Sequence, residues 1–322
     1  MKMRRTVFAL LVSAWCAGLA AQGYPSKAVK IVVPYPAGGY YDLIARIVGP
    51  KLSDALGQPF IVENRVGANA IVGTAYTAKS PADGYTIMVG GIGPHAINVS
   101  LYKSLPYDPV RDFAPIIHVA VQPLILVVNP KVEASSLKDF IALARSRPSQ
   151  LAYASAGAGS THHLAGEMFR SMAGVELNHV PFKGSAPAVM ATLAGHTDVH
   201  FGTASDVLQQ IKARKLHALA VTSLNRIPAL PELPTISETA IPNYEAVAWF
   251  AFFAPGGTPR EIISRLNSEI GKILDMPDIR GKLSSEGTVQ IIGGTPELLG
   301  NFTKAQIVKW SKIVESSGAK AD

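Results

Sequence analysis

Residues 31–42 read IVVPYPAGGYYD, an apolar run that ends in a Gly-Gly turn and passes into an amphipathic helical pattern. Residues 151–164 read LAYASAGAGSTHHL and repeat this arrangement in the second half of the chain. A glycine turn that leads into a helix leaves the first backbone N–H groups of that helix unpaired, at the positive end of its dipole. Such a turn forms an anion site from backbone alone. Two of these turns therefore predict two lobes that hold one small anion between them.

Strand-like segments alternate with amphipathic helical patterns along the chain, which favours an α/β fold with mainly parallel sheets flanked by helices. The predicted strands are 29–34, 60–63, 86–90, 151–155, 178–180, 199–201 and 216–222. The predicted helices are 42–56, 73–79, 136–147, 163–172, 187–193, 207–213, 259–274, 277–286 and 296–316. The last three helices show no further sheet between them, and we expect them to pack on the first lobe.

Two apolar runs are expected to carry the chain from one lobe to the other. The first spans 113–130 and contains Pro123, which predicts that one strand ends there and another begins. The second spans 246–254. The sequence thus predicts a first domain made of 22–121 and 249–322, a second domain made of 122–248, and a hinge at the two crossings.

The chain begins with the pattern of a secretory signal peptide over residues 1–21. Three cations, Lys2, Arg4 and Arg5, precede the apolar run 7–12, and small residues follow. The run is shorter than the roughly 20 residues that span a bilayer, so a cleaved signal is favoured over a membrane anchor. The single cysteine lies in this segment, so the exported mature chain is expected to contain no disulfide.

The charge of the mature chain is modestly positive. Removal of the three N-terminal cations lowers the formal net charge from +7 to +4. No block of Lys and Arg with interleaved aromatic residues is present, so nucleic acid has little support as a partner. A weakly positive field instead suits a small anionic ligand.

The second glycine turn resembles two enzyme motifs but matches neither of them. A dinucleotide fingerprint needs glycine where His162 stands. A nucleophile elbow needs glycine where Tyr153 stands. The pair His162 and His163 and the pair His196 and His200 do not form a zinc pattern, and the mature chain has no cysteine. We predict no catalytic residue, metal or cofactor, with a hydrolase or isomerase in the same cleft as the enzymatic alternative.

Candidate ligand-binding residues in the first turn are its glycines and the residues just after them. Gly38 and Gly39 would let a ligand carboxylate approach the backbone closely. Tyr40 and Tyr41 either stack on the ligand or pack against the lobe. Asp42 would repel an anion, so we expect it to order the loop rather than touch the ligand.

The second turn supplies the other candidate ligand-binding residues. Gly159, Ser160 and Thr161 are expected to surround the same carboxylate, with the two hydroxyl groups acting as donors, as helix caps, or as both. His163 and Thr203 complete the predicted set.

Twelve segments, in this order, closely resemble the Bug family of periplasmic solute receptors, also called the tripartite tricarboxylate transporter receptor family. These segments are 34–39, 56–59, 62–65, 83–86, 105–109, 112–115, 153–157, 163–167, 179–184, 219–222, 230–235 and 254–259. The resemblance covers essentially the whole mature chain. No one of these segments is decisive, but the ordered set is highly specific.

The resemblance implies a type II-like Venus-flytrap fold in the periplasm, with the ligand between two lobes. It also implies that backbone N–H groups and bridging waters of the two glycine turns hold one ligand carboxylate. The implied partners are a small carboxylate and the subunits of a tripartite tricarboxylate-type membrane transporter. The mature chain would be a monomer that does not insert into the membrane, and some relatives present their ligand to a membrane sensor instead.

The sequence departs from the family pattern in two places that bear on the ligand. Tyr40 and Tyr41 fill positions that are often small in the family. Gly202 stands where many members carry an aspartate that could face a ligand ammonium group. An amino acid is therefore disfavoured, and the balance tilts towards an aromatic or other non-amino carboxylate.

Overall fold

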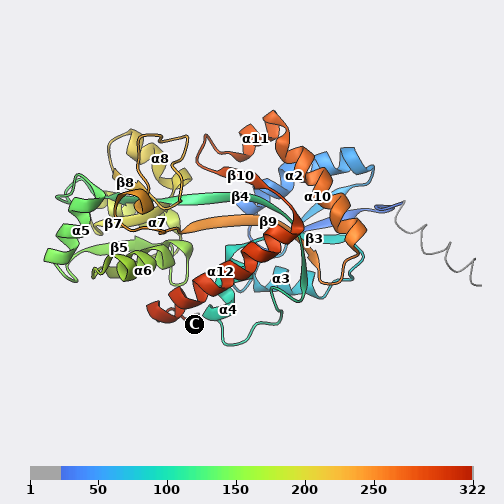
Figure 1. Cartoon of the computed structure of the whole chain (residues 1–322), viewed down its shortest axis with the longest axis horizontal. Coiled ribbons are helices and arrows are strands. Elements are labelled where there is room, and N and C mark those ends of the chain that lie inside the picture. The colour runs from blue at the N-terminus through green and yellow to red at the C-terminus, as the bar shows by residue number, and fades with distance from the viewer. Residues whose placement is uncertain (1–22, 321–322) are drawn as a thin grey trace, which may run out of the picture.

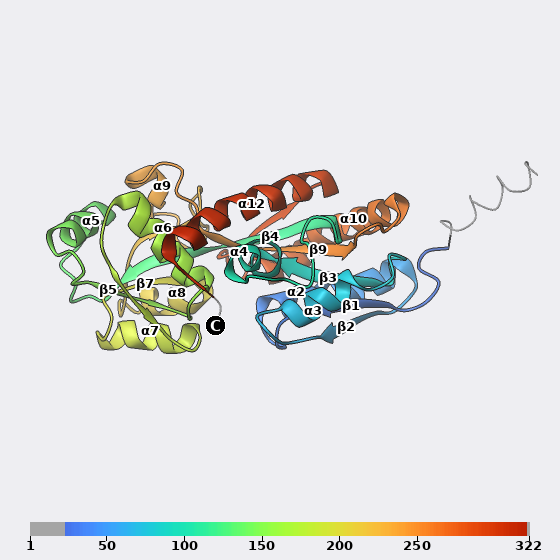
Figure 2. The ribbon, with the colours of Figure 1, turned by 90° about the horizontal axis from the view of Figure 1, so that it is seen from below.

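Two groups of strands, each covered by helices, lie at opposite ends of the molecule and are joined by two long strands (Figures 1 and 2). The computed structural model describes residues 23–320, so the predicted signal peptide lies outside the described residues. We refer to the part built on the first three strands as the first lobe, and to the part built on the fifth, sixth and seventh strands as the second lobe.

The first lobe has a parallel core. Strand β1 pairs in parallel with both β2 and β3. Its elements are β1 (Val29–Val33), α2 (Tyr40–Leu56), β2 (Phe60–Asn64), α3 (Ile71–Ala78), β3 (Thr86–Gly91), the π-helical turn η1 (Gly93–Ile97) and α4 (Asn98–Leu101). The bounds of the three strands and of α2 and α3 agree with the predictions to within two residues, because apolar periodicity and glycine punctuation mark them locally. The short elements η1 and α4 were not predicted.

The second lobe repeats the parallel arrangement, with β5 paired to both β6 and β7. Its elements are α5 (Leu137–Ser146), β5 (Ala152–Ser155), α6 (Thr161–Ala173), β6 (Asn178–Pro181), α7 (Ser185–Ala194), β7 (Val199–Thr203), α8 (Ala204–Lys212), β8 (His217–Val221) and α9 (Ile236–Thr239). Each glycine turn of the sequence analysis thus follows the first strand of a parallel unit and starts a helix.

The crossings are strands β4 (Phe113–Val128) and β9 (Val247–Pro255), which run antiparallel to each other. The predicted break at Pro123 is wrong, because β4 is one continuous strand of 16 residues. The strand continues through Pro123 because its neighbouring strand changes there. Pairing with β9 ends at Pro123 opposite Val247, and pairing with β7 begins at Leu124. A residue without an N–H group is tolerated where one ladder ends and the next begins.

Antiparallel pairing is confined to the strands around the crossing, so the sheet is mixed. Its order is β2-β1-β3-β9-β4-β7-β5-β6, and both β8 and β10 (Gln290–Gly293) also pair with β4. Strand β10 was not predicted. It has four residues and follows a turn in which Ser285, Glu286 and Gly287 all have positive φ, so it shows little periodicity to detect.

The three C-terminal helices are α10 (Arg260–Asp275), α11 (Pro277–Leu283) and α12 (Pro296–Ser317). Helices α10 and α11 pack on α2 of the first lobe, as predicted. Helix α12 instead lies along both lobes (Figure 2). It contacts α4 through Ser311, whose hydroxyl lies 2.6 Å from that of Ser100, and it contacts α6 of the second lobe.

The core beneath α12 contains a histidine that is buried like an apolar residue. The His95 ring is fully buried and stacks on Phe253 with 4.0 Å between ring centroids. Neither of its nitrogens has a hydrogen-bond partner among the described residues. Burial lowers the pKa of His95 to about 3.

Acid should therefore destabilise this protein through His95. Because the folded-state pKa lies below the unfolded value near 6.5, the unfolded chain binds the proton first as the pH falls. We expect His95→Phe to reduce the dependence of the unfolding free energy on pH by about 1.4 kcal/mol per pH unit between about pH 6 and 4. Urea unfolding at a series of pH values measures this slope. The exposed His196→Gln serves as control, and equal slopes in both variants would contradict the assignment.

Candidate functional site

A cavity of about 240 Å³ lies between the first turn of α2 and the glycine turn that starts α6, next to the crossing strands. Its first-lobe and crossing residues are Tyr35, Tyr41, Asn69, Ile92, Gly93, Ile97, Leu124, Ala248 and Phe250. Its second-lobe residues are Gly159, Ser160, Thr161, His162 and Thr203. No Asp, Glu, Lys or Arg is among them, so any charge on a ligand would meet dipoles rather than ions.

The first turn is held in shape by Asp42. Its carboxylate accepts hydrogen bonds from the Gly38 N–H at 3.0 Å, from Arg46 Nε at 2.8 Å and from Asn64 Nδ2 at 2.9 Å. These donors, Arg46 foremost, hold the pKa of Asp42 at about 2. Asp42 is buried and does not line the cavity, in agreement with its predicted role in ordering the loop.

Helix α2 begins at the first turn with unpaired donors. Gly39 is its N-cap and provides no side-chain cap, and the Leu43 N–H makes the first helical hydrogen bond, to the Gly39 carbonyl. The N–H groups of Gly39, Tyr40 and Tyr41 have no hydrogen-bond partner among residues 23–320. The Gly38 N–H, by contrast, is already used by Asp42.

The two tyrosines of the first turn have different positions. Tyr41 lines the cavity, between Tyr35 at 4.5 Å and Phe250 at 4.7 Å between ring centroids. Tyr40 also packs on Phe250, at 4.6 Å, but its hydroxyl donates a 2.5 Å hydrogen bond to the Leu283 carbonyl of α11. Tyr41 therefore contributes an aromatic wall, whereas Tyr40 ties α2 to the C-terminal helices.

The second turn is closed by its own side chains. Ser160 is the N-cap of α6, and its Oγ accepts from the His163 N–H at 3.2 Å and donates to the Gly157 carbonyl at 2.7 Å. The Gly159 N–H donates to Nδ1 of His163 at 3.0 Å. His163 is thus buried behind the turn and supports it, while Gly159, Ser160 and Thr161 line the cavity.

The second turn also touches the first lobe. Gly159 has φ of +73°, and a Cβ built on it would lie 2.7 Å from Cδ2 of Leu101 on α4. Glycine is required here both by the backbone conformation and by the neighbouring lobe. The second turn therefore packs on α4 of the first lobe at the edge of the cavity.

A family model described as "Tripartite tricarboxylate transporter family receptor" matches residues 44–319. The chain belongs to this family. The receptor is 37% identical to the protein BugT of Bordetella pertussis, over 99% of this chain and 99% of BugT.

Two solved structures of similar receptors contain a bound acid. An R. palustris protein with adipate is 37% identical, with a TM-score of 0.78 over 92% of this chain and 99% of that chain. MatC from Rhodopseudomonas palustris, with bound malate, is 29% identical, with a TM-score of 0.73 over 90% of this chain and 100% of that chain. The receptor is thus similar throughout its length to periplasmic solute-binding proteins.

Five of the ten predicted site residues line the cavity, and five lie behind it. Those in the lining are Tyr41, Gly159, Ser160, Thr161 and Thr203. Those outside it are Gly38, Gly39, Tyr40, Asp42 and His163. Contact between any of them and a ligand stays a prediction, and Gly39 and Tyr40 would take part only through backbone N–H groups.

Sequence reasoning missed the part of the wall that comes from loops distant in sequence. Asn69 lies in a loop where Ala68, Asn69 and Ala70 all have positive φ, and its side chain donates to Asn98 Oδ1 at 3.1 Å. Gly93 is needed because a Cβ there would lie 2.5 Å from the Tyr35 hydroxyl. Only the Gly-Ala-Asn-Ala composition of the first loop could have signalled an unusual turn.

Gly202 has a steric explanation in this receptor. It is buried on β7, and a Cβ there would lie 2.4 Å from Cγ1 of Val207 and 2.8 Å from Cδ2 of His200. The position therefore has no room for an aspartate, and the cavity lining offers no carboxylate to a ligand ammonium group.

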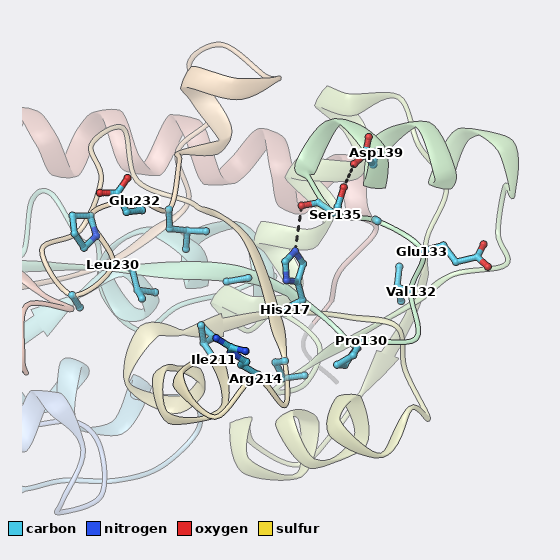
Figure 3. A pocket seen from close by; sticks show the side chains of 16 residues that line it. Pro130, Val132, Glu133, Ser135, Asp139, Ile211, Arg214, His217, Leu230 and Glu232 are labelled. Carbon is cyan, nitrogen blue, oxygen red and sulfur yellow. Dashed lines mark hydrogen bonds between the residues drawn. The ribbon is translucent and has the colours of Figure 1, made fainter.

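A larger hollow of about 1010 Å³ lies elsewhere on the receptor (Figure 3). All of its lining residues fall between Pro130 and Leu233, and none belongs to either glycine turn. His217 spans part of it, with Nε2 at 3.3 Å from the Ser135 carbonyl. Of these two cavities, the smaller one contains residues from the first turns of both α2 and α6.

Two negative findings complete the description. Within residues 23–320, no group of three or more His, Cys, Asp or Glu side chains could hold a metal ion. In the same part of the chain, no helix is both long enough and apolar enough to span a membrane.

The role of Asp42 can be tested by stability. We expect Asp42→Ala to lower the unfolding free energy by about 2 kcal/mol, because three donors lose a buried acceptor. Arg46→Ala, which removes only the half-exposed ion-pair partner, should cost much less, because an exposed ion pair contributes little to stability. Because the folded-state pKa is lowered, the Asp42 contribution is present above about pH 4 and is lost as the pH falls towards 2. Urea unfolding of both variants at pH 7 measures the difference, and equal losses would argue against loop ordering by Asp42.

Proposed function

We propose that this receptor captures a small carboxylate in the 240 Å³ cavity and delivers it to a tripartite tricarboxylate-type membrane transporter. The observation that carries the proposal is the convergence of two helix starts on one cavity without charged side chains. Unpaired N–H groups at helix starts bind anions without a counter-ion. Similar receptors solved with adipate and malate support an acid as the ligand class.

The proposed ligand is an aromatic or other non-amino acid. Tyr35, Tyr41 and Phe250 form one wall, and Ile92 and Leu124 add apolar surface. The volume lies below the roughly 300–1,000 Å³ of pockets for drug-sized ligands, which favours a compact acid. Without a carboxylate in the lining, a ligand ammonium group would be desolvated without compensation.

We also propose that the two lobes close on the ligand by a hinge at β4 and β9. In this proposal, residues 22–121 and 249–322 form one domain and residues 122–248 form the other. The boundaries between them fall within β4 and β9. Ligand binding shifts the population towards closure only if both turns contact the ligand in that state. The transporter would then recognise the closed form. In this proposal the receptor is a monomer in the periplasm, released by cleavage after residue 21.

Two alternatives have different test outcomes. A hydrolase would need an accessible nucleophile. Near the second turn, Ser155 Oγ lies 2.6 Å from His179 Nε2, but this serine is fully buried and outside the cavity lining. Conversion of a bound acid during overnight incubation would establish that alternative. A sensor partner would bind the same ligand, and only a transport assay in a deletion strain separates that role from delivery.

The ligand class can be tested with a panel of acids. We expect benzoate-like or nicotinate-like acids to raise the melting temperature and to bind in calorimetry, because ligands that bind only the folded state stabilise it. Glutamate and citrate should bind more weakly or not at all. Tight glutamate binding without binding of aromatic acids would overturn the ligand class, and no stabilisation by any carboxylate would overturn the proposed function.

The backbone anion site can be tested with a pair of variants. Gly39→Val should reduce affinity by about tenfold or more, because a side chain there blocks approach to the free N–H groups. Folding should be retained, since Gly39 has φ of −80° and its Cβ would meet nothing closer than 3.9 Å. Ser160→Ala should cost about 1 kcal/mol of binding, or about fivefold, through the one neutral hydrogen bond that its hydroxyl would make to the ligand in place of the Gly157 carbonyl. Equal small effects in calorimetry would place the anion elsewhere.

A further inference from the structure

His162 is a polar side chain of the cavity lining that the proposed binding mode does not use. It lies in the first turn of α6, after Ser160 and Thr161, and is 6% exposed. Its Nδ1 is fully buried and has no hydrogen-bond partner among the described residues. A buried, unpaired ring nitrogen costs free energy unless something at the site compensates it.

A second histidine stands directly behind it. The His200 ring on β7 lies 5.3 Å from the His162 ring between centroids, at 72° to it. Nδ1 of His200 lies 3.0 Å from the Ala154 carbonyl, which can only accept, so Nδ1 carries the hydrogen. In the neutral ring Nε2 is then a bare lone pair, and it too is buried without a partner in the described chain.

The surroundings keep both rings neutral while the cavity holds no anion. Burial lowers the pKa of His162 to about 3 and also lowers that of His200. The charged group that faces the pair is Asp206 in the first turn of α8, whose carboxylate accepts from Ser185. On α6 itself, the neighbouring His163 is engaged by the Gly159 N–H.

From this arrangement we propose that His162 and His200 act as a proton-accepting pair, so that capture of a carboxylate is coupled to uptake of a proton. This inference rests on the proposed function, because it needs an anion in the cavity. A bound carboxylate would be the only charge inside the lining, and it would lie against the His162 ring, behind which the His200 ring packs. A proton taken up by the pair gives His162 a charge opposite to that of the ligand. The proton would bind to Nδ1 of His162, the nitrogen without a hydrogen-bond partner in the described chain.

The size of the coupling follows from the distance. An opposite charge within about 4–6 Å raises a histidine pKa by about 1–3 units. His162 lines a small cavity, so a bound carboxylate falls in this range. At the upper end of this range, where the pKa rises from about 3 to between 5 and 6, the receptor should bind the same acid about two- to tenfold more tightly at pH 5 than at pH 7.5.

Calorimetry tests the coupling directly. The best-binding acid among benzoate, nicotinate, adipate and malate is titrated into the mature receptor at pH 5 and pH 7.5. At pH 5 the titration is repeated in two buffers of different ionisation enthalpy, which counts the protons taken up. We expect net uptake at pH 5 and almost none at pH 7.5.

Matched variants assign the proton. His162→Gln keeps a polar side chain that does not titrate and should remove both the pH ratio and the uptake, and the exposed His196→Gln should change neither. Comparison with the unaltered receptor on the same acid cancels ionisation of the ligand itself. If His162→Gln does not fold, the buffer-dependent uptake in the unaltered receptor decides. Binding without uptake would overturn this inference alone, whereas failure of all four acids to bind would overturn the proposed function as well.

Discussion

The antiparallel pairing of β4 with β9 is the constraint on which the rest of the receptor depends. Successive side chains of a strand point to opposite faces of the sheet, so the register of this pair decides which residues of β9 enter which of the two hydrophobic cores. Trp249 and Phe253 enter the core that contains His95, whereas Phe250 and Phe252 enter the core beneath α2. Phe250 and Ala248, two residues apart, also reach the cavity. A shift of one residue would exchange these sets.

The same pair sets the positions of the glycine turns. Strand β9 joins β3 of the first lobe, and β4 joins β7 of the second, so the sheet continues from one lobe into the other. Each turn follows a parallel strand of its own lobe, and its position relative to β4 and β9 is therefore fixed by the pairing within that sheet. Two helix starts can face each other across about 240 Å³ only because both sheets are anchored to one ladder.

An uncharged cavity is a coherent way to hold an anion. The free N–H groups of α2 and the first turn of α6 provide partial positive charge that is fixed by the backbone. Asp42 is the buried anion nearest the first turn, and its charge is satisfied by Arg46, Asn64 and the Gly38 N–H rather than directed into the cavity. A lysine in the lining would bind more acids but would discriminate among them less, because its ammonium group is a point charge that accepts any carboxylate geometry.

The sequence allowed prediction of what local signals determine. Strand and helix positions, both glycine turns and the loop-ordering role of Asp42 follow from periodicity and turn chemistry close in the chain. The predicted break at Pro123 was wrong because the sequence shows that proline lacks an N–H group, but not whether a neighbouring strand would accept a hydrogen bond at that position. Tyr40 and Tyr41 are adjacent and chemically alike, and only the tertiary position of the Leu283 carbonyl separates their roles. Asn69 reaches the cavity from a loop and Gly93 from the start of η1, and no local pattern reveals that either residue lies there.

Backbone strain on the cavity wall points to the same site independently. Ala68, Asn69 and Ala70 are three consecutive non-glycine residues with φ of 44°, 49° and 73°. Each left-handed residue costs on the order of 1 kcal/mol, so the loop persists only because its surroundings hold it. The Asn98 side chain does so, since its Nδ2 donates to the Asn69 carbonyl at 2.9 Å and its Oδ1 accepts from Asn69. Asn98 is fully buried, and α12 packs over η1 and α4. The loop is therefore set before a ligand arrives, and binding need not supply the free energy to order this wall.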